Sequence, residues 1–148
     1  MAEETLTTIS PSTNQAILIR QGLSSSDVAL LPAIAAQSFN GFRLTSFEQR
    51  QAIVKKALRL INDKQHVLAR ELTEQMGRPI AYTAKEITTA VARGEYLLKI
   101  SGDALKDTEG EPEQGFKRYI RKAPIGPVLI LFAWNVGWSN SSTEHRGC

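Results

Sequence analysis

The residues that could carry chemistry gather near the C-terminal end of the sequence. The final stretch, APIGPVLILFAWNVGWSNSSTEHRGC, runs from Ala123 to Cys148 and contains the chain's single cysteine. A cysteine thiolate is a nucleophile, and a carboxylate such as that of Glu144 can act as a general base. Each role requires surrounding structure that fixes the side chain.

Cys148 and its neighbours lack such surroundings in the sequence. Cys148 follows a polar, Ser-rich stretch with no predicted helix or strand, whereas a reactive thiol needs a positioned activator. We expect an exposed thiol at Cys148. Nothing in the sequence predicts a pocket around Glu144. His145 and Cys148 have a spacing that two metal ligands could use, but a structural zinc site needs four. The other histidine, His66, is expected at the start of a helix, so the sequence predicts no metal site.

The composition bounds the class of protein. The chain has 148 residues, of which 42% are hydrophobic, which suits one domain with a real core. One cysteine cannot form an internal disulfide, and the opening MAEETLTTIS does not resemble a signal peptide. No run approaches the roughly 18 apolar residues of a membrane span. We therefore expect a cytoplasmic protein with no membrane partner.

The one basic cluster lies in FKRYIRK and comprises Lys117, Arg118, Arg121 and Lys122. It could be a patch that contacts phosphate groups or the solvated face of an extended strand. The net charge of +3 is mild, so we favour the solvated face and expect no nucleic-acid partner.

The elements that would position the C-terminal stretch begin with a predicted hairpin over residues 8–20. Pro11 to Asn14 supply turn chemistry, and Ile9 could face Ile17 and Ile19 across the two strands. We expect residues 1–7 to be disordered.

A helical layer is predicted over residues 25–105. Ser25 or Ser26 can cap a first helix that continues to Phe39, provided that Pro32 lies in its first turn or starts its regular part. Ser46 and Gln49 form a capping box for a second helix. Its apolar stripe comprises Val54, Ala57, Leu58 and Ile61.

Two more helices complete the predicted layer. A second capping box, Asn62 with Gln65, opens a helix that carries Leu68, Leu72 and Met76 on one face. Gly77 ends that helix, and Pro79 prevents its continuation. The last helix runs from about Ala81 to Ile100, with its face formed by Ile87, Val91, Gly94 and Leu98. Gly94 favours close packing against a neighbour, since glycine in a helix otherwise costs up to about 1 kcal/mol.

Extended strands are predicted over residues 116–135. The stretch from Phe116 to Lys122 mixes apolar and basic residues, as a partly exposed strand would. The run from Val128 to Phe132 is continuously apolar, which is typical of a strand buried on both faces of a parallel sheet. No later segment of the sequence supplies a partner strand for it.

These motifs together resemble the aldehyde dehydrogenase superfamily. PIGPVLILFAWN is similar to that family's P-x-G…W-N stretch, with Pro124, Gly126, Trp134 and Asn135 at the family's spacing. TISPSTNQAI resembles its opening hairpin, and the segment that ends in Gly-Arg-Pro resembles its helical segment that ends in Gly-Lys-Pro. The resemblance runs from about Thr8 to Asn135.

The resemblance implies an incomplete α/β fold of the aldehyde dehydrogenase type over residues 8–135, ending in the first strand of a Rossmann-type sheet. It also implies oxidation of an aldehyde to a carboxylic acid with NAD or NADP. Asn135 would donate to the oxyanion, and Phe132, Ala133, Trp134 and Asn135 would bind the cofactor. Ala133 departs from the proline that many members carry there.

From Val136 onward the sequence departs from the family's pattern. Residues 136–148 read VGWSNSSTEHRGC, and we expect them to be an aberrant, disordered tail of a truncated product. The family's catalytic cysteine, its glutamate and its Gly-rich cofactor loop have no counterpart in residues 1–148. The sequence therefore predicts a chain that is inactive alone and does not bind the cofactor. Two alternatives are an interaction module that pairs with full-length subunits and a helical scaffold unrelated to the family.

Overall fold

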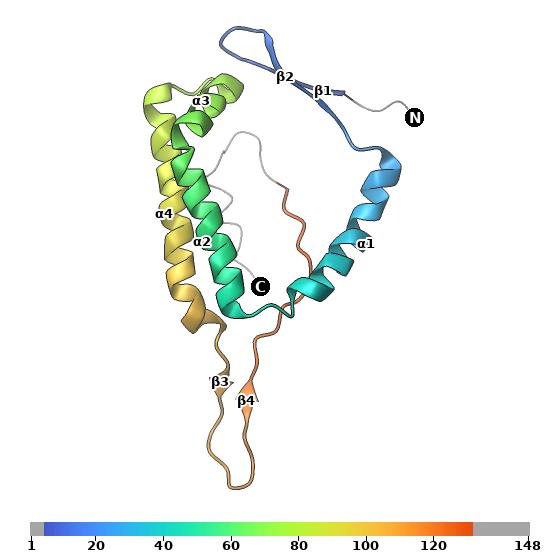
Figure 1. Cartoon of the computed structure of the whole chain (residues 1–148), viewed down its shortest axis with the longest axis vertical. Helices are drawn as coiled ribbons and strands as arrows, with labels where there is room; N and C mark the ends of the chain where they lie inside the picture. Colours follow the sequence, from blue (N-terminus) through green and yellow to red (C-terminus); the bar gives the residue numbers. More distant parts are fainter. Residues whose placement is uncertain (1–4, 132–148) are drawn as a thin grey trace.

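The computed structural model describes residues 5–131 of the chain. The elements within that range are, in order, β1 (Thr5–Ile9), β2 (Ala16–Gln21), α1 (Ser25–Phe42), α2 (Phe47–Asp63), α3 (Gln65–Met76), α4 (Ile80–Leu105), β3 (Thr108–Glu109) and β4 (Tyr119–Ile120). Two small antiparallel sheets flank the helices (Figure 1). The arrangement is the incomplete α/β fold that the sequence predicts.

The N-terminal hairpin forms as predicted but starts earlier. β1 pairs with β2 in antiparallel register, with Thr7 opposite Ile19 and an irregularity after Thr8. Because β1 begins at Thr5, the prediction of disorder over residues 1–7 is wrong for residues 5–7. The backbone N–H of Asn14 donates to the carbonyl of Ser10 at 2.8 Å, and Asn14 adopts a φ of 57°. Asparagine tolerates this left-handed conformation better than most residues.

Helix α1 differs from its prediction at both ends and in the middle. Its N-cap is Ser24, not Ser25 or Ser26, and its hydroxyl accepts from the backbone N–H of Asp27 at 3.1 Å. The helix continues past Phe39 to Phe42, and Pro32 lies in its interior, not its first turn. An interior proline removes one backbone hydrogen bond from the helix. No residue of α1 is buried among the described residues.

The capping predictions for the next two helices had opposite outcomes. The Ser46–Gln49 box of α2 is confirmed, because the Ser46 hydroxyl accepts from the Gln49 N–H at 3.2 Å and the Gln49 side chain accepts from the Ser46 N–H at 2.8 Å. The Asn62–Gln65 box is wrong. Lys64 is the N-cap of α3, with no side-chain hydrogen bond, because α2 continues to Asp63 and keeps Asn62 helical.

The core lies where α4 packs against α2 and α3 (Figure 1). Its buried apolar residues are Ala69 and Leu72 of α3 with Ile87, Ala90 and Val91 of α4. The prediction of close packing at Gly94 is confirmed, since a Cβ added there would lie 2.5 Å from Leu58 Cδ2 of α2. Leu58 therefore occupies the space that a larger residue at position 94 would need.

The segment after α4 forms less strand than the sequence predicts. β3 and β4 pair antiparallel into a short arm that projects away from the helices (Figure 1). Of the described part of the range 116–135, only Tyr119–Ile120 is strand. Residues 128–131 form no strand, and the exposed fraction of the Leu129 side chain is 84%. The physical reason is that no described strand lies beside this run to accept its backbone hydrogen bonds.

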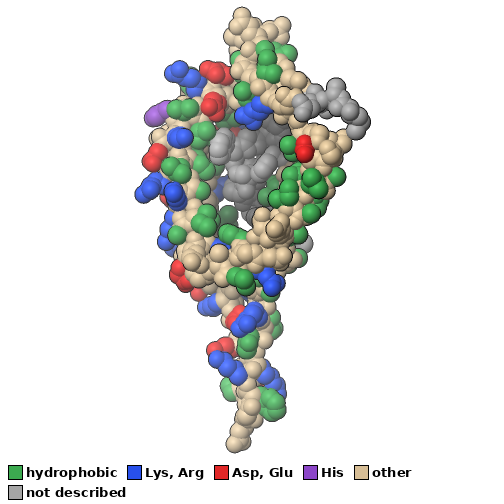
Figure 2. Space-filling model, turned by 45° about the vertical axis from the view of Figure 1, so that its right-hand side comes forward, with side chains coloured by type: hydrophobic (Ala, Val, Ile, Leu, Met, Phe, Trp, Pro, Cys, Tyr) green, Lys and Arg blue, Asp and Glu red, His purple; other side chains and the backbone are tan. Residues whose placement is uncertain are grey.

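Apolar side chains also remain exposed along α1. They include Val28, Leu30, Leu31 and Ile34, whose exposed fractions lie between 45% and 55%. Figure 2 shows hydrophobic side chains gathered on the α1 side of the molecule. None of the helices between residues 5 and 131 has the length and apolar character needed to cross a membrane.

Candidate functional site

The predicted site residues lie outside the part of the chain that the structure describes. Phe132, Ala133, Trp134 and Asn135 follow directly after residue 131, the last described residue. Glu144, His145 and Cys148 also lie outside it. The structure therefore bears on this site through the segment that leads into it, residues 116–131.

Basic residues at the base of that segment bind the end of α4 and the residues that connect α4 to β3. Lys122 Nζ donates to the carbonyl of Ala104 at 2.6 Å, near the C-terminal end of α4. Arg121 Nε donates to Asp107 Oδ2 at 3.3 Å, and its guanidinium lies 4.9 Å from the centre of the Tyr119 ring. These contacts set where the chain leaves the arm and turns toward residues 123–131.

The same contacts bear on the two interpretations of the basic cluster. Arg121 and Lys122 bind partners within the chain, and Arg118 forms an ion pair with Glu113 on the arm. A phosphate-binding patch would present its cations to solvent together. The observed pairing favours the solvated face of a short strand.

Beyond Lys122 the chain runs without regular structure to residue 131. Gly126, between Pro124 and Pro127, has a φ of +150°, which favours glycine. The exposed fraction of Ile125 is 93%. The described approach to the predicted site is thus an irregular segment with exposed apolar side chains and one glycine of positive φ.

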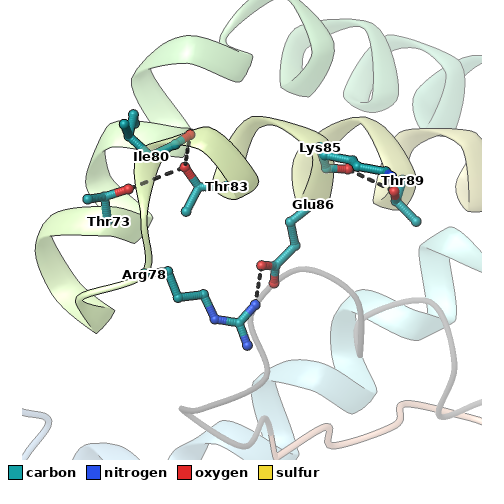
Figure 3. Close-up of polar contacts among 7 residues, drawn as sticks. All are labelled: Thr73, Arg78, Ile80, Thr83, Lys85, Glu86 and Thr89. Carbon is teal, nitrogen blue, oxygen red and sulfur yellow. Dashed lines mark hydrogen bonds and ion pairs between the residues drawn. The ribbon is translucent and has the colours of Figure 1, made fainter.

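The most buried ionic contact of the described residues lies elsewhere, at the junction of α3 and α4. Arg78 Nη1 donates to Glu86 Oε2 at 2.5 Å, and the Glu86 side chain is 11% exposed (Figure 3). The second carboxylate oxygen, Oε1, is buried and has no hydrogen-bond partner. Nearby, the Thr83 hydroxyl donates to the carbonyl of Ile80 and lies 3.2 Å from the Thr73 hydroxyl.

The contacts at this junction hold the end of α3 and the connection after it against α4. Glu86 is paired with Arg78 between two packed helices and faces no described cavity, which is typical of a structural ion pair. The sequence interpretation missed this pair. A signal was present, since Glu86 occurs at helical spacing with the buried residues Thr83, Ile87 and Ala90. A carboxylate on such a face indicates a cationic partner nearby.

Two further observations complete the chemistry of the described residues. Within residues 5–131, no group of three or more His, Cys, Asp or Glu side chains is placed to hold a metal ion. The pKa of Glu48, in the first turn of α2, is lowered by its hydrogen bond to its own backbone N–H and by the Ser46 hydroxyl. Glu48 is exposed, and its negative charge lies in the first turn of α2, where it stabilises the N-terminal end of the helix.

Comparison with known proteins shows similarity over most of the chain. The model of the aldehyde dehydrogenase family matches residues 1–144, further in both directions than the stretch from Thr8 to Asn135. The chain is 29% identical over 128 residues to a 3-succinoylsemialdehyde-pyridine dehydrogenase of Pseudomonas sp, covering 86% of this chain and 26% of that protein. It is 20% identical over 127 residues to the succinate semialdehyde dehydrogenase [NAD(P)+] Sad of Escherichia coli K12, covering 86% and 27%.

Solved structures show the same fold. The crystal structure of PnpE in complex with nicotinamide adenine dinucleotide superposes with a TM-score of 0.73 at 21% identity, covering 82% of this chain and 25% of that one. The chain therefore spans about a quarter of the length of the curated relatives it matches. The match to the family model covers nearly all of its residues, and the chain belongs to the aldehyde dehydrogenase family.

Proposed function

We propose that this chain is the N-terminal part of an NAD(P)-dependent aldehyde dehydrogenase that oxidises an aldehyde to a carboxylic acid. The observation that carries the proposal is the family match over residues 1–144. It is supported by relatives whose names specify semialdehyde dehydrogenases and by the likeness in fold to an NAD complex. A cytoplasmic location stays a prediction from composition.

Within that reaction we assign Asn135 the role of oxyanion donor. When a thiolate attacks an aldehyde carbon, the carbonyl oxygen gains negative charge, and a neutral amide can stabilise that charge without changing its own protonation. Removing one such donor typically costs about 2.7–4 kcal/mol of transition-state stabilisation. Phe132, Ala133 and Trp134 would line the cofactor beside it. A bound nicotinamide would accept the hydride, and this stretch of the chain would orient the reacting oxygen.

We further propose that residues 1–148 alone turn over no aldehyde. They contain a single cysteine, at position 148, where the sequence offers no activating partner. The described acidic residue with the deepest burial, Glu86, is held by Arg78. The proposal thus rests on the lack of a positioned activator for Cys148 in the sequence and on the pairing of Glu86 with Arg78.

A direct assay tests the inactivity. Purified chain is mixed with a semialdehyde, such as succinate semialdehyde, and with NAD or NADP, and reduced cofactor is followed by absorbance at saturating substrate. We expect no rate above the buffer control. A rate that the Asn135→Ala variant abolishes would overturn the proposed inactivity.

A chimera tests the role of Asn135. Residues 5–135 replace the corresponding part of the E. coli succinate semialdehyde dehydrogenase, and the Asn135→Ala and Asn135→Asp variants are compared with the parent chimera. We expect kcat to fall about 10²–10³-fold in both variants, because neither side chain keeps the amide donor. Circular dichroism and the thermal unfolding midpoint serve as the folding control, because Asn135 is itself assigned to the cofactor site. Unchanged kcat in a folded variant would contradict the assignment.

A further inference from the structure

A cavity of about 1000 Å³ opens between the corner where α1 meets α2 and two segments that lie much later in the sequence. Its lining comes from the C-terminal half of α1, the first turn of α2, the C-terminal end of α4 and residues 122–127. The α1 wall consists of Ala35, Ser38, Phe39 and Phe42, whose spacing places them on one face of the helix. Phe47 of α2 faces Gly102 of α4, where an added Cβ would lie 3.8 Å from Phe47 Cε1.

The polar groups around this cavity are almost all cationic. Its described lining includes Arg43, Arg50, Lys106 and Lys122, and no described lining residue is acidic. Ser38 is the one uncharged polar side chain of that lining. A ligand rich in hydroxyl or amide groups would find few partners there, whereas an apolar ligand with one anionic end would find both surfaces that it needs.

Three of the four cations, Arg50, Lys122 and Lys106, have partners within the chain. Arg50 Nη1 donates to the carbonyl of Thr45 and Lys122 Nζ to that of Ala104, each at 2.6 Å. These bonds orient the two side chains without neutralising them. Lys106 pairs at 3.0 Å with Asp103, whose side chain is 88% exposed, and such surface pairs are weak. The cavity therefore keeps an excess of positive charge beside an apolar wall.

We propose that this cavity binds an amphipathic carboxylate, a molecule with an apolar tail and one anionic end. The tail lies against Phe39, Phe42 and Phe47, and the carboxylate lies near Arg43 and Lys106. The volume falls at the upper end of the roughly 300–1,000 Å³ range of small-molecule pockets. This proposal does not depend on the proposed catalytic function, because none of these residues has a role in it.

Isothermal titration calorimetry on the full 148-residue chain tests the ligand chemistry. Three probes of equal tail length are titrated below their micelle concentrations: dodecanoate, dodecanol and dodecyltrimethylammonium. We expect dodecanoate to bind at least about tenfold more tightly than the other two. Equal affinities for all three would show a general apolar surface and overturn the proposal, as would no binding of dodecanoate.

Three variants locate the site. Arg43→Gln combined with Lys106→Gln removes two cations that hold no backbone carbonyl and should abolish the preference for dodecanoate over dodecanol. Lys55→Gln combined with Arg59→Gln, on α2 outside this cavity, is the matched control and should leave the preference intact. Gly102→Leu should block the tail without changing any charge, and circular dichroism checks that each variant keeps its helices. Unchanged dodecanoate binding by a folded Gly102→Leu variant would overturn the proposed location.

Discussion

Helices α1 and α4 are both rich in apolar residues, yet they differ in what covers them. In α4, Ile87 is fully buried, and Ala90 and Val91 are nearly so. In α1 no residue is buried, and Leu30 and Ile34 are each 55% exposed. Apolar content alone therefore does not decide burial in this chain. A partner surface within reach decides it.

The packing of the helices, not the length of their connections, separates the two cases. Helix α4 packs against α3, from which only residues 77–79 separate it, and also against α2. Helix α1 is joined to α2 by residues 43–46, a connection just as short, yet it makes few contacts with the other described helices. The same contrast applies to Ile125 and Leu129, which are the most exposed of the large apolar side chains. Among the described residues, α2, α3 and α4 thus form a layer of helices that pack against one another.

The largest expected effect comes from the core of that layer. Ile87→Ala should reduce the free energy of unfolding by about 2–5 kcal/mol, since it removes a fully buried side chain. Val28→Ala in α1 is the control and should change stability by less than about 0.5 kcal/mol. Urea unfolding followed by circular dichroism measures both values. Similar losses for the two variants would contradict the contrast between the helices.

The Arg78–Glu86 pair should give the next largest effect. Arg78→Ala leaves the carboxylate of Glu86 buried without its cation and should cost about 1–3 kcal/mol. The double variant Arg78→Ala with Glu86→Leu should recover much of that loss, because it removes the unpaired charge as well. A double variant as unstable as the single one would show that the pair is not what stabilises the junction.

Substitutions at two glycines should change stability by smaller amounts. Gly77 has a φ of +71°, and an added Cβ would lie 2.9 Å from Pro11 Cγ in the hairpin turn. Gly77→Ala should therefore cost about 1–2 kcal/mol from the backbone conformation alone. Gly41→Ala, in α1 with open space around it, should be neutral or slightly stabilising in thermal unfolding. Destabilisation by Gly41→Ala would indicate that α1 packs against another surface in solution.

The helix caps should show the smallest difference. Ser46→Ala removes the capping box of α2 and should cost about 1 kcal/mol in urea unfolding. Ser24→Ala removes the equivalent box of α1 but should leave the main transition unchanged, because α1 lies outside the packed layer. The comparison fails if the midpoint of that transition shifts equally in both variants.

The sequence predicted those features that depend on local rules. The Ser46–Gln49 box, the end of α3 at Gly77 and the buried face around Ile87 follow from capping chemistry and helical period. It failed where a neighbouring element decided the outcome. The Asn62–Gln65 box did not form because α2 runs on to Asp63, and the run from Val128 formed no strand because a strand needs a second chain segment.

The candidate site was predicted by resemblance, since spacing alone gives Asn135 no role. The assignment of Phe132, Ala133, Trp134 and Asn135 stays a prediction, because these residues lie outside the described range. The Arg78–Glu86 pair could have been found from the sequence, because Glu86 shares the spacing of the buried residues on α4. The cationic cavity could not, since only the fold brings the α1–α2 corner beside the end of α4 and residues 122–127.

Hydrogen–deuterium exchange on the intact chain tests the central claim most directly. The claim is that the layer of α2, α3 and α4 is packed by itself, whereas α1 and residues 123–131 remain uncovered. We expect slow exchange for the α4 amides around Ile87 and Val91, and fast exchange throughout α1 and residues 123–131. Protection of α1 equal to that of α4 would contradict it.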